Sequence, residues 1–322
     1  MTDSPTRITR LAPSPTGSLH LGNARTFLIN WALARRGGWQ VVLRIEDLDG
    51  PRVKAGASEQ AIEVLSWLGM DWDGEPVWQS ADPAPYQEAL EALQAKELVY
   101  PCRCTRKEIQ RAQSAPHDSE HELRYPGTCR PSDVAELAAN APRVDLEPSD
   151  TAWRLIVPDE GVTFHDEVLG GRTINVQRQV GDFVVASKNG APAYQLAVVV
   201  DDARQGVTDV VRGDDLVRST ARQMWLYRLL DLAPRPRYWH LPLVLGPDGR
   251  RLAKRHGDTR LIHYKQAGVP AERVVGLIAW WSGASDDRRE MGAAEFAQQF
   301  DIARLPREPV TFTEEDDAWL TA

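Results

Sequence analysis

The 322-residue sequence predicts an α/β protein in which a nucleotide-binding parallel sheet is split by an insertion and followed by a helical segment. Apolar, strand-like runs alternate with amphipathic segments up to about residue 99, and this alternation is typical of a parallel sheet. The pattern stops between residues 100 and 192 and then resumes. From about Asp258 the apolar residues recur at helical spacing, with Val274, Leu277, Ile278 and Trp281 on one stripe.

The expected elements divide the chain into four parts. The first half of the nucleotide-binding domain covers 1–99, with strands at 8–12 and 41–45 and helices from Leu21 and around 60–68. The insertion covers 100–192, with a polar loop at 114–150, short strands at 153–157 and 183–187, and a tight turn at Asn189-Gly190. The second half covers 193–257, where the alternation resumes with 194–200, 207–212, a helix near 217–230, and 239–245. The helical segment covers 258–322.

The net charge of −8 at pH 7 argues against a general nucleic-acid-binding protein, because neutralising phosphates needs a basic surface. Two local basic clusters, at 103–111 and 250–260, are also compatible with ordinary solvated faces. No apolar run approaches the roughly 20 residues that span a membrane, and no secretory segment is evident. We therefore expect a cytoplasmic protein without a membrane partner.

Residues 10–23 have the pattern of a strand end, a Pro/Gly loop and a helix start, which is an anion-binding arrangement. Leu21, Ala24 and Leu28 recur at helical spacing, so His20 and Gly22 would lie at the positive N-terminus of a helix. Gly22 would let a nucleotide approach the backbone, and His20 would donate a hydrogen bond to a phosphate oxygen. Taken alone, this segment is also compatible with a plain strand-turn-helix junction and a surface histidine.

Residues 12–25 resemble the HIGH signature of class I aminoacyl-tRNA synthetases, in the form found in the glutamyl branch. Residues 44–49, 67–73 and 100–105 resemble further segments of that branch, in the same order. The resemblance covers roughly residues 7 to 257. It implies a Rossmann-like catalytic domain with a zinc-containing insertion and a C-terminal helical segment.

A second motif follows a turn at 246–249, which leads into a loop with several cations. Residues 250–255 resemble the KMSKS loop of the same family, and Lys254 matches its second lysine, which is expected to stabilise charge as pyrophosphate leaves. Arg251 stands in place of the first lysine and Ala253 in place of the serine, so we expect the loop to lack one hydrogen bond. Alone, these residues are also compatible with a basic surface turn.

The resemblance implies roles for individual residues. It implies His20 and Lys254 as catalytic residues, and an ATP site made of His20, Gly22, Asn23 and Lys254. It also implies an L-glutamate site made of Arg10, Ser14, Glu46, Tyr194 and Arg212. The chemistry agrees, because arginine pairs bidentately with a carboxylate and disfavours an amide, whereas a glutamate side chain can hold an α-ammonium group. Each residue alone is as well explained by a structural role; together we expect them at strand ends or first βα loops, where open α/β sheets bind ligands.

The implied reaction begins with attack of the glutamate α-carboxylate on the α-phosphate of ATP, which gives glutamyl-adenylate and pyrophosphate. Alignment and charge stabilisation carry much of such catalysis, and Mg²⁺ is expected to bind with ATP. A carboxylate is already nucleophilic, so no general base is required.

Three cysteines, Cys102, Cys104 and Cys129, cluster closely enough to predict a metal site rather than a disulfide framework. A tetrahedral Zn²⁺ needs one further donor, and His117, His121 and Tyr125 lie nearby in the sequence. Metal chemistry alone favours His121, because a phenol with a pKa near 10 must be deprotonated to bind well. The resemblance instead favours Tyr125, because synthetases that glutamylate queuosine share a C-x-C motif followed by Y-x3-C. Three reduced thiols without a metal are the remaining alternative.

The chain ends about 65 residues after the KMSKS-like loop, whereas a discriminating glutamyl-tRNA synthetase is expected to carry an anticodon-binding domain of at least about 100 residues there. The chain is therefore similar to truncated members of the family that activate glutamate without tRNA and attach it to queuosine at the wobble position of tRNA(Asp). The implied partners are ATP, L-glutamate and tRNA(Asp) bearing queuosine, and we expect a monomer. The alternatives are a minimal glutamyl-tRNA synthetase that charges the 3′ end and a non-catalytic regulator that binds tRNA or glutamate.

Overall fold

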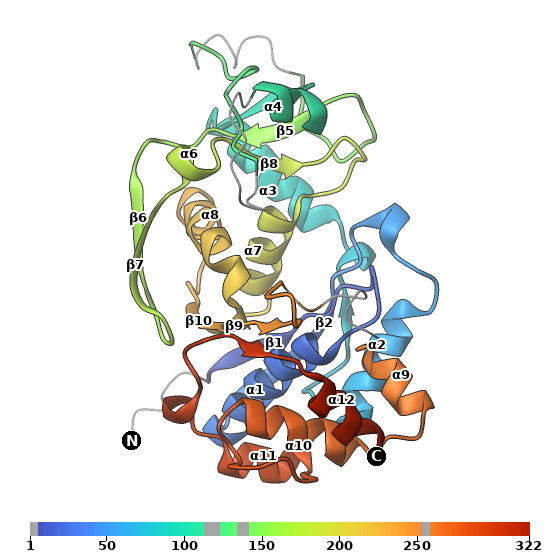
Figure 1. Cartoon of the computed structure of the whole chain (residues 1–322). Coiled ribbons are helices and arrows are strands. Elements are labelled where there is room, and N and C mark those ends of the chain that lie inside the picture. The colour runs from blue at the N-terminus through green and yellow to red at the C-terminus, as the bar shows by residue number, and fades with distance from the viewer. Residues whose placement is uncertain (1–5, 113–122, 134–141, 251, 253–257) are drawn as a thin grey trace. The chain divides into compact units, whose positions relative to one another are not determined.

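The computed structural model describes residues 6–112, 123–133, 142–250, 252 and 258–322 (Figure 1). The chain forms two compact units, each of which is built from separate stretches of sequence. Unit 1 comprises Met1–Ala81, Val207–Leu216 and Pro236–Ala322, and unit 2 comprises Asp82–Gly206 and Val217–Arg235. No helix among the described residues combines the length and apolar character needed to cross a bilayer.

Unit 1 is built on parallel strands. The strands β1 (Ile8–Leu11), β2 (Gln40–Ile45) and β3 (Val77–Trp78) form one parallel set, in that order. The strands β9 (Asp209–Gly213) and β10 (Arg237–Leu241) form a second parallel pair, and β11 (Val244–Leu245) pairs in parallel with β12 (Val310–Thr311). β9 lies beside β1, because the Thr208 N–H donates to the Ile8 carbonyl at 2.8 Å. After β1 the chain forms β2 on one side of it, and β9, much later in the sequence, lies on the other side. Open α/β sheets bind ligands at such a reversal of strand order.

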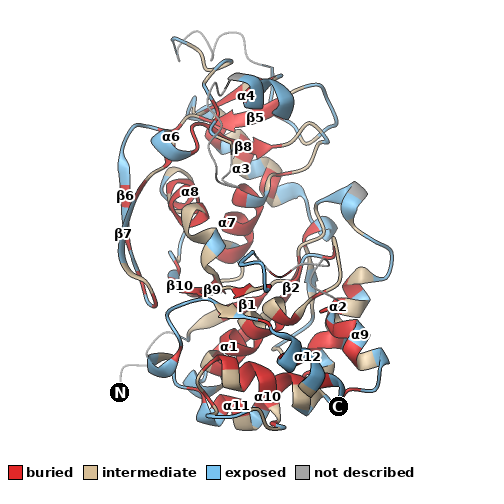
Figure 2. Cartoon of the chain, in the orientation of Figure 1, coloured by how far each residue is buried: buried red, intermediate tan, exposed pale blue. Residues whose placement is uncertain are grey.

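The helices of unit 1 bury the faces that the sequence predicts. They are α1 (Leu21–Gly37), α2 (Ala57–Trp67), α9 (Leu261–Gln266), α10 (Ala271–Trp281), α11 (Ala293–Gln299) and α12 (Glu314–Thr321), with short 3₁₀ turns η1 (Gly50–Arg52), η2 (Gln79–Ala81), η3 (Asp214–Leu216) and η5 (Ile302–Arg304). α1 packs against β1, β9, α10 and α11. The predicted stripe of α10 is buried, with Val274, Leu277 and Ile278 fully enclosed, and the buried faces of α1 and α10 are visible in Figure 2.

Unit 2 combines a small antiparallel sheet with helices. The sheet has the order β4 (Val99–Cys102), β5 (Ala152–Leu155), β8 (Phe183–Ala186), and an antiparallel hairpin joins β6 (Gly161–Asp166) to β7 (Gly170–Asn175). The helices are α3 (Ala84–Ala95), α4 (Arg106–Ala112), α6 (Val176–Gln179), α7 (Tyr194–Arg204) and α8 (Val217–Leu229). α7 packs against α3, α8 and β8, so it forms the centre of this unit.

Most of the predicted elements are present, including the strands at 8–12, 41–45, 153–157 and 183–187, whose ends differ only slightly from the predicted ones. The tight turn at Asn189-Gly190 is confirmed, because Gly190 has a φ of +72° and its N–H donates to the Ser187 carbonyl at 3.1 Å. A side chain there would also collide with the backbone, since an added Cβ would lie 2.7 Å from the Leu146 carbonyl oxygen. The predicted run at 239–245 is divided between β10 and β11.

The segment 194–200 needs a correction. Tyr194 was expected near a strand end, but it is the first residue of helix α7. Every residue from Gln195 to Val200 is buried. A continuous apolar run does not distinguish a buried strand from a buried helix, because neither period shows when all sides are covered.

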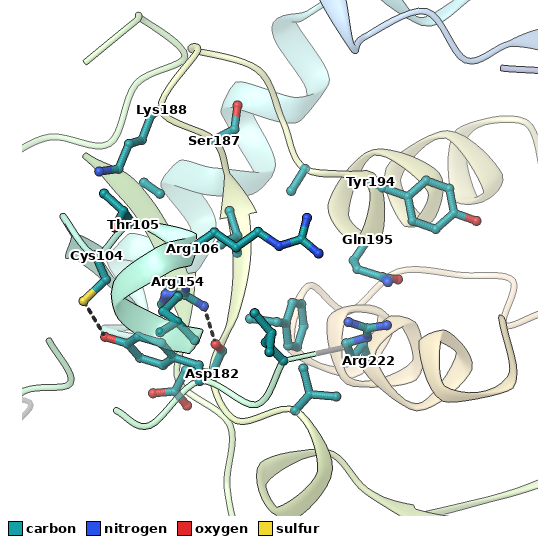
Figure 3. A pocket seen from close by; sticks show the side chains of 18 residues that line it. Cys104, Thr105, Arg106, Arg154, Asp182, Ser187, Lys188, Tyr194, Gln195 and Arg222 are labelled. Carbon is teal, nitrogen blue, oxygen red and sulfur yellow. Dashed lines mark hydrogen bonds between the residues drawn. The ribbon is translucent and has the colours of Figure 1, made fainter. Parts of the chain in front are cut away.

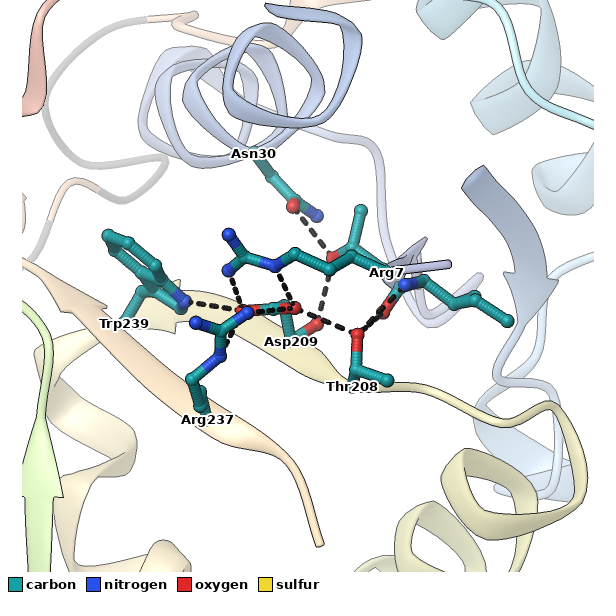
Figure 4. A network of polar contacts seen from close by, with 8 residues as sticks. Arg7, Asn30, Thr208, Asp209, Arg237 and Trp239 are labelled. Carbon is teal, nitrogen blue, oxygen red and sulfur yellow. Dashed lines mark hydrogen bonds and ion pairs between the residues drawn. The ribbon is translucent and has the colours of Figure 1, made fainter. Parts of the chain in front are cut away.

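A buried carboxylate joins the strands at the centre of unit 1 (Figure 4). Asp209, at the start of β9, accepts hydrogen bonds from Arg7 Nε at 2.8 Å, Trp239 Nε1 at 3.0 Å and Thr208 Oγ1 at 2.8 Å. Arg237 adds an ion pair at 3.3 Å from β10. Burial alone would raise the pKa of Asp209, but the hydrogen bonds from Arg7, Thr208 and Trp239 outweigh it and hold the pKa below its ordinary value.

We predict that Asp209→Asn lowers the free energy of unfolding at pH 7 by about 3 kcal/mol, because it leaves the arginines beside Asp209 without their carboxylate. Since the folded pKa of Asp209 is depressed, its stabilisation is present above the unfolded pKa of about 3.9 and is lost as the pH falls through the folded value. In urea unfolding, the difference in the free energy of unfolding between Asp209→Asn and wild type should therefore become smaller as the pH falls from 7 to 3. The control Asp286→Asn removes an exposed ion pair with Arg304 and should leave stability nearly unchanged at all pH values. A gap that stays constant across this pH range would contradict the assignment.

Candidate active site

The junction between β1 and α1 has the geometry of an anion site. His20 is the N-cap of α1 in an extended conformation, and its Nδ1 accepts a hydrogen bond from the Gly22 N–H at 3.1 Å. Asn23 completes a capping box, because its Oδ1 accepts from the His20 N–H at 3.1 Å. With Nδ1 acting as acceptor, the neutral imidazole carries its proton on Nε2. His20 can therefore donate through Nε2 at the positive end of a 17-residue helix.

Gly22 is held close to this imidazole. A Cβ added at Gly22 would lie 3.1 Å from both Cε1 and Nδ1 of His20 and 3.6 Å from Cβ of Val244. A side chain at position 22 would therefore press on the imidazole ring of His20. The predicted need for glycine at this position thus has a structural reason in the position of His20.

Arg10 and Arg212, two residues of the predicted glutamate site, lie near the carboxyl ends of the neighbouring strands β1 and β9. The Arg10 Nη1 donates to the Val211 carbonyl at 3.4 Å, although these residues are 201 positions apart. The Arg212 Nε donates to His240 Nε2 at 3.1 Å, and its Nη2 reaches the Leu216 carbonyl at 3.4 Å. Both arginines are almost completely buried, with 5% and 4% of their surface exposed. A guanidinium group pairs most strongly with an anion such as a carboxylate.

Glu46 directly follows β2, and Ser14 lies in the loop after β1. The Glu46 N–H donates to the Pro13 carbonyl at 3.0 Å, which joins the end of β2 to the loop after β1. The Glu46 carboxylate accepts from the Arg44 Nη2 at 3.1 Å, and Arg44 itself is fully buried. Ser14 is exposed. Unit 1 therefore contributes four of the five predicted glutamate-site residues, and Tyr194, 41% exposed at the start of α7, belongs to unit 2.

The predicted turn before the KMSKS-like loop is confirmed. The Gly246 N–H donates to the Arg250 carbonyl at 2.7 Å, and Gly249 has a φ of +71°. Leu252 is buried and its N–H donates to the Val244 carbonyl at 3.1 Å, so the loop leaves from β11. Lys254, together with Arg251 and Ala253, lies outside the described residues.

Two positioning residues were not among the predicted site residues. Arg25 is 1% exposed on α1 and donates to the Pro242 carbonyl at 2.5 Å and to the Trp281 carbonyl at 3.4 Å. Burial lowers the pKa of Arg25 to about 10, against the opposing charge of Asp214. His240, fully buried on β10, holds Arg212. In the sequence, Arg25 stands out as a charged residue on the apolar stripe of α1, four positions after Leu21. No pattern in the residues around His240 marks that histidine.

The three cysteines of unit 2 lie together with Tyr125. The Sγ atoms of Cys102, Cys104 and Cys129 all lie within 4.8 Å of one another, and those of Cys104 and Cys129 are 3.4 Å apart. The Tyr125 hydroxyl lies 3.5 Å from Cys102 Sγ and 4.0 Å from Cys104 Sγ. These spacings fit a tetrahedral Zn²⁺, because bonds of about 2.3 Å place two sulfur ligands about 3.8 Å apart. The alternative donors His117 and His121 lie outside the described residues.

Arg154 and local hydrogen bonds surround this cluster. The Arg154 Nε donates to Cys102 Sγ at 3.2 Å, and its guanidinium carbon lies 3.8 Å from the centre of the Tyr125 ring. Burial alone would raise the pKa of the Cys129 thiol, but its hydrogen bond with Cys104 outweighs this effect and lowers the pKa to about 7. Burial and the contact with Cys102 raise the pKa of the Tyr125 phenol. Burial also raises the pKa of the Cys104 thiol to about 11, so Cys129 ionises more readily than either Cys104 or Tyr125.

The chain matches known proteins over nearly its whole length. The family model of class I tRNA synthetases (E and Q), catalytic domain, matches residues 7–319. The glutamyl-Q tRNA(Asp) synthetase of Rhodopirellula baltica is 46% identical, over 94% of this chain and 95% of that protein. The glutamyl-Q tRNA(Asp) synthetase of Symbiobacterium thermophilum is 45% identical, over 97% of this chain and 98% of that protein.

Longer relatives match less closely. The glutamate–tRNA ligase of Oleidesulfovibrio alaskensis is 37% identical, over 97% of this chain but 65% of the ligase. The crystal structure of a glutamate tRNA ligase from Elizabethkingia meningosepticum, in complex with its amino acid, superposes with a TM-score of 0.78 at 27% identity, over 98% of this chain and 69% of the ligase. The parallel sheet, the capped helix after β1 and these matches agree: the chain is a ligase-type enzyme that belongs to the class I tRNA synthetases of the E and Q type.

Proposed function

We propose that this enzyme activates L-glutamate with ATP in the absence of tRNA and transfers it to queuosine at the wobble position of tRNA(Asp). The observation that carries the first part is the pair of buried arginines, Arg10 and Arg212, near the carboxyl ends of two adjacent strands. Such a pair can hold carboxylate, and the ligand site of an open α/β sheet lies at this edge. Similarity to glutamyl-Q tRNA(Asp) synthetases over nearly their full length supports the second part.

In the proposed glutamate site the two arginines pair with carboxylate and Glu46 holds the α-ammonium group. Arg44 donates to Glu46 and thereby orients its carboxylate. Glutamine is disfavoured because its NH₂ group would face guanidinium donors without an acceptor. Ser14 and Tyr194 are the proposed hydroxyl contacts to the amino acid.

The proposed ATP site uses the N-terminus of α1. His20 Nε2 donates to a phosphate oxygen, Gly22 keeps the approach to the backbone open, and Asn23 fixes the N-cap through its bond to the His20 N–H. Lys254 is the proposed second cation for the phosphates, and Mg²⁺ would bind with ATP and offset the remaining charge. These groups act by positioning and by stabilising charge rather than by proton transfer.

The two steps balance without an added co-reactant. In the first, a glutamate α-carboxylate oxygen attacks the α-phosphorus, an O–P bond forms, and pyrophosphate leaves with the electrons of the broken P–O bond. In the second, an acceptor hydroxyl oxygen attacks the carbonyl carbon of glutamyl-adenylate and forms an ester. AMP leaves with the electrons of the anhydride C–O bond, and the hydroxyl proton passes to solvent.

A minimal glutamyl-tRNA synthetase is the second candidate, because glutamate–tRNA ligases are also 36–37% identical over 97% of this chain. Both candidates share activation and differ in the acceptor. The monomeric state and the cytoplasmic location expected from the sequence stay predictions.

We predict that ATP and radiolabelled glutamate label queuosine-containing tRNA(Asp), and that tRNA(Asp) without queuosine stays unlabelled, because only the modified base carries the acceptor. Removal of the 3′-terminal adenosine should leave labelling intact, and ATP–pyrophosphate exchange should proceed with glutamate alone. Charging of tRNA(Glu), with loss of label when the 3′ adenosine is removed, would instead identify a minimal glutamyl-tRNA synthetase.

A second prediction concerns amino-acid selection. Arg212→Gln should raise the KM for glutamate in ATP–pyrophosphate exchange about 100-fold, since a charge-assisted pair contributes up to about 3 kcal/mol. The preference for glutamate over glutamine should narrow as well. Arg235→Gln, at an exposed position, is the matched control and should behave as wild type. An unchanged KM in Arg212→Gln would remove Arg212 from the site.

We further propose that Cys102, Cys104, Cys129 and Tyr125 hold one structural Zn²⁺. Three sulfur donors and one oxygen donor complete a tetrahedral set, and a closed set of this kind stabilises its fold rather than supplying a reactive water. The proposed ion lies where β4 ends and the segment 123–130 returns to it. It would therefore hold two separate parts of unit 2 together.

Purified wild-type protein should contain about one Zn²⁺ per chain, and Cys129→Ser should lose most of it, because a serine hydroxyl is a poor zinc ligand at neutral pH. Tyr125→Phe should bind Zn²⁺ more weakly than wild type, which a competitive chelator titration will measure. Full zinc affinity in Tyr125→Phe would assign the fourth position to another donor. Cys129→Ser with unchanged zinc content would rule out the site.

A further inference from the structure

Arg212, one of the two arginines proposed to hold glutamate, contacts a histidine on the neighbouring strand. Arg212 and His240 occupy directly paired positions of the parallel strands β9 and β10. The Arg212 Nε donates to His240 Nε2 at 3.1 Å, and the two residues are 4% and 0% exposed. The contact therefore lies in the interior of unit 1, near the carboxyl ends of both strands.

This hydrogen bond fixes the protonation state of His240. A guanidinium group carries donors and no acceptor, so His240 Nε2 must be the acceptor. An imidazolium ion could not serve, because both of its nitrogens carry a proton. His240 is therefore neutral, with its proton on Nδ1.

Tyr238 supports the same arginine from the same strand. It lies two positions before His240 on β10, and alternate residues of a strand point to one face. The rings of Tyr238 and His240 are stacked, with centres 6.1 Å apart and an angle of 12° between their planes. The guanidinium carbon of Arg212 lies 5.4 Å from the centre of the Tyr238 ring. An arginine that is held in this way loses less conformational freedom when it binds a ligand.

The charge of the acceptor at position 240 affects what Arg212 can select. A carboxylate there would pair with the guanidinium and would repel the carboxylate of a substrate, and such repulsion is strong in a buried site. A neutral imidazole orients the Nε group and adds no negative charge of its own beside Arg212. It therefore favours a ligand that brings a carboxylate over one that brings an amide.

We propose that His240 is a specificity-determining residue of the glutamate site, which orients Arg212 as a neutral acceptor and thereby favours glutamate over glutamine. This inference rests on the proposed function, because it treats Arg212 as a contact of the amino acid. His240 acts through Arg212 and is a positioning residue. Its loss should therefore affect the binding of glutamate and leave the binding of ATP unchanged.

Three variants of His240 test this role in ATP–pyrophosphate exchange. His240→Phe keeps a ring but cannot accept from Arg212, so the KM for glutamate should rise about tenfold while the KM for ATP stays the same. His240→Gln offers an amide oxygen as acceptor and should bring the KM for glutamate back to within about threefold of wild type. His240→Glu offers an acceptor with negative charge and should reduce the preference for glutamate over glutamine about tenfold.

The matched control is His165→Phe, which makes the same substitution at an exposed position on β6 and should behave as wild type. A double-mutant cycle shows whether His240 acts through Arg212. When Arg212→Gln is already present, adding His240→Phe should change the KM for glutamate by less than about twofold, because the contact has been lost. Effects that multiply in the double variant would contradict the proposal.

Nitrogen-15 NMR of wild-type protein with labelled histidine gives a readout that does not depend on the folding of a variant. His240 should give a neutral signal with the proton on Nδ1, whereas His20 should carry its proton on Nε2. Glutamate should shift the Nε2 resonance of His240, because a carboxylate on Arg212 polarises the group that donates to it, and glutamine should not.

An unchanged KM for glutamate in His240→Phe would overturn the proposal, as would a His240 resonance that does not respond to glutamate. A rise in the KM for ATP equal to that for glutamate would do the same, because it would indicate a general structural role. Failure of the proposed function gives a different pattern. In that case wild type does not exchange pyrophosphate with glutamate, or Arg212→Gln matches wild type, and the role of His240 is rejected together with the site.

Discussion

The register of β1 against β9 and β10 is the constraint on which unit 1 depends, and the buried carboxylate of Asp209 sets it. Asp209 receives hydrogen bonds from Arg7, which precedes β1, and from Trp239 on β10 (Figure 4). A parallel pair that slips by one residue would turn its side chains to the opposite face. The same register places Arg10 and Arg212 at one end of adjacent strands, so the proposed glutamate site is a consequence of this buried network.

Four arginines of unit 1 are almost completely buried. Arg10, Arg25, Arg44 and Arg212 are each at most 5% exposed. Burying a guanidinium costs free energy unless it is hydrogen-bonded and its charge is balanced. Arg25 meets backbone carbonyls at the end of α10 and before β11, which connects the capped helix α1 to the strand that leads into the KMSKS-like loop. A guanidinium group at the sheet edge can pair with a bound carboxylate or phosphate.

In unit 2, Arg154 links the cysteine cluster to Asp182. Its guanidinium contacts Cys102 and the Tyr125 ring on one side and donates to the Asp182 carbonyl at 2.8 Å on the other. The proposed zinc cluster therefore supports one wall of a cavity of about 770 Å³ in unit 2, into which Arg106 extends (Figure 3). Folding of the metal site and shaping of the cavity depend on the same short segments, β4, β5 and the residues around 125.

Features that depend on local chemistry could be predicted from the amino-acid sequence. These include the loop and capped helix start around His20, the turn at Asn189-Gly190, the cysteine spacing and the apolar stripe of α10, because neighbouring residues and short periods specify each of them. The resemblance in those motifs also led to the family. Three other facts became visible only in the folded protein: Arg10 lies beside Val211, His240 holds Arg212, and the run after Tyr194 is a helix. Strand neighbours in a parallel sheet are separated by long crossovers, and a run that is buried on all sides carries no period, so none of these facts is encoded within a short window of residues.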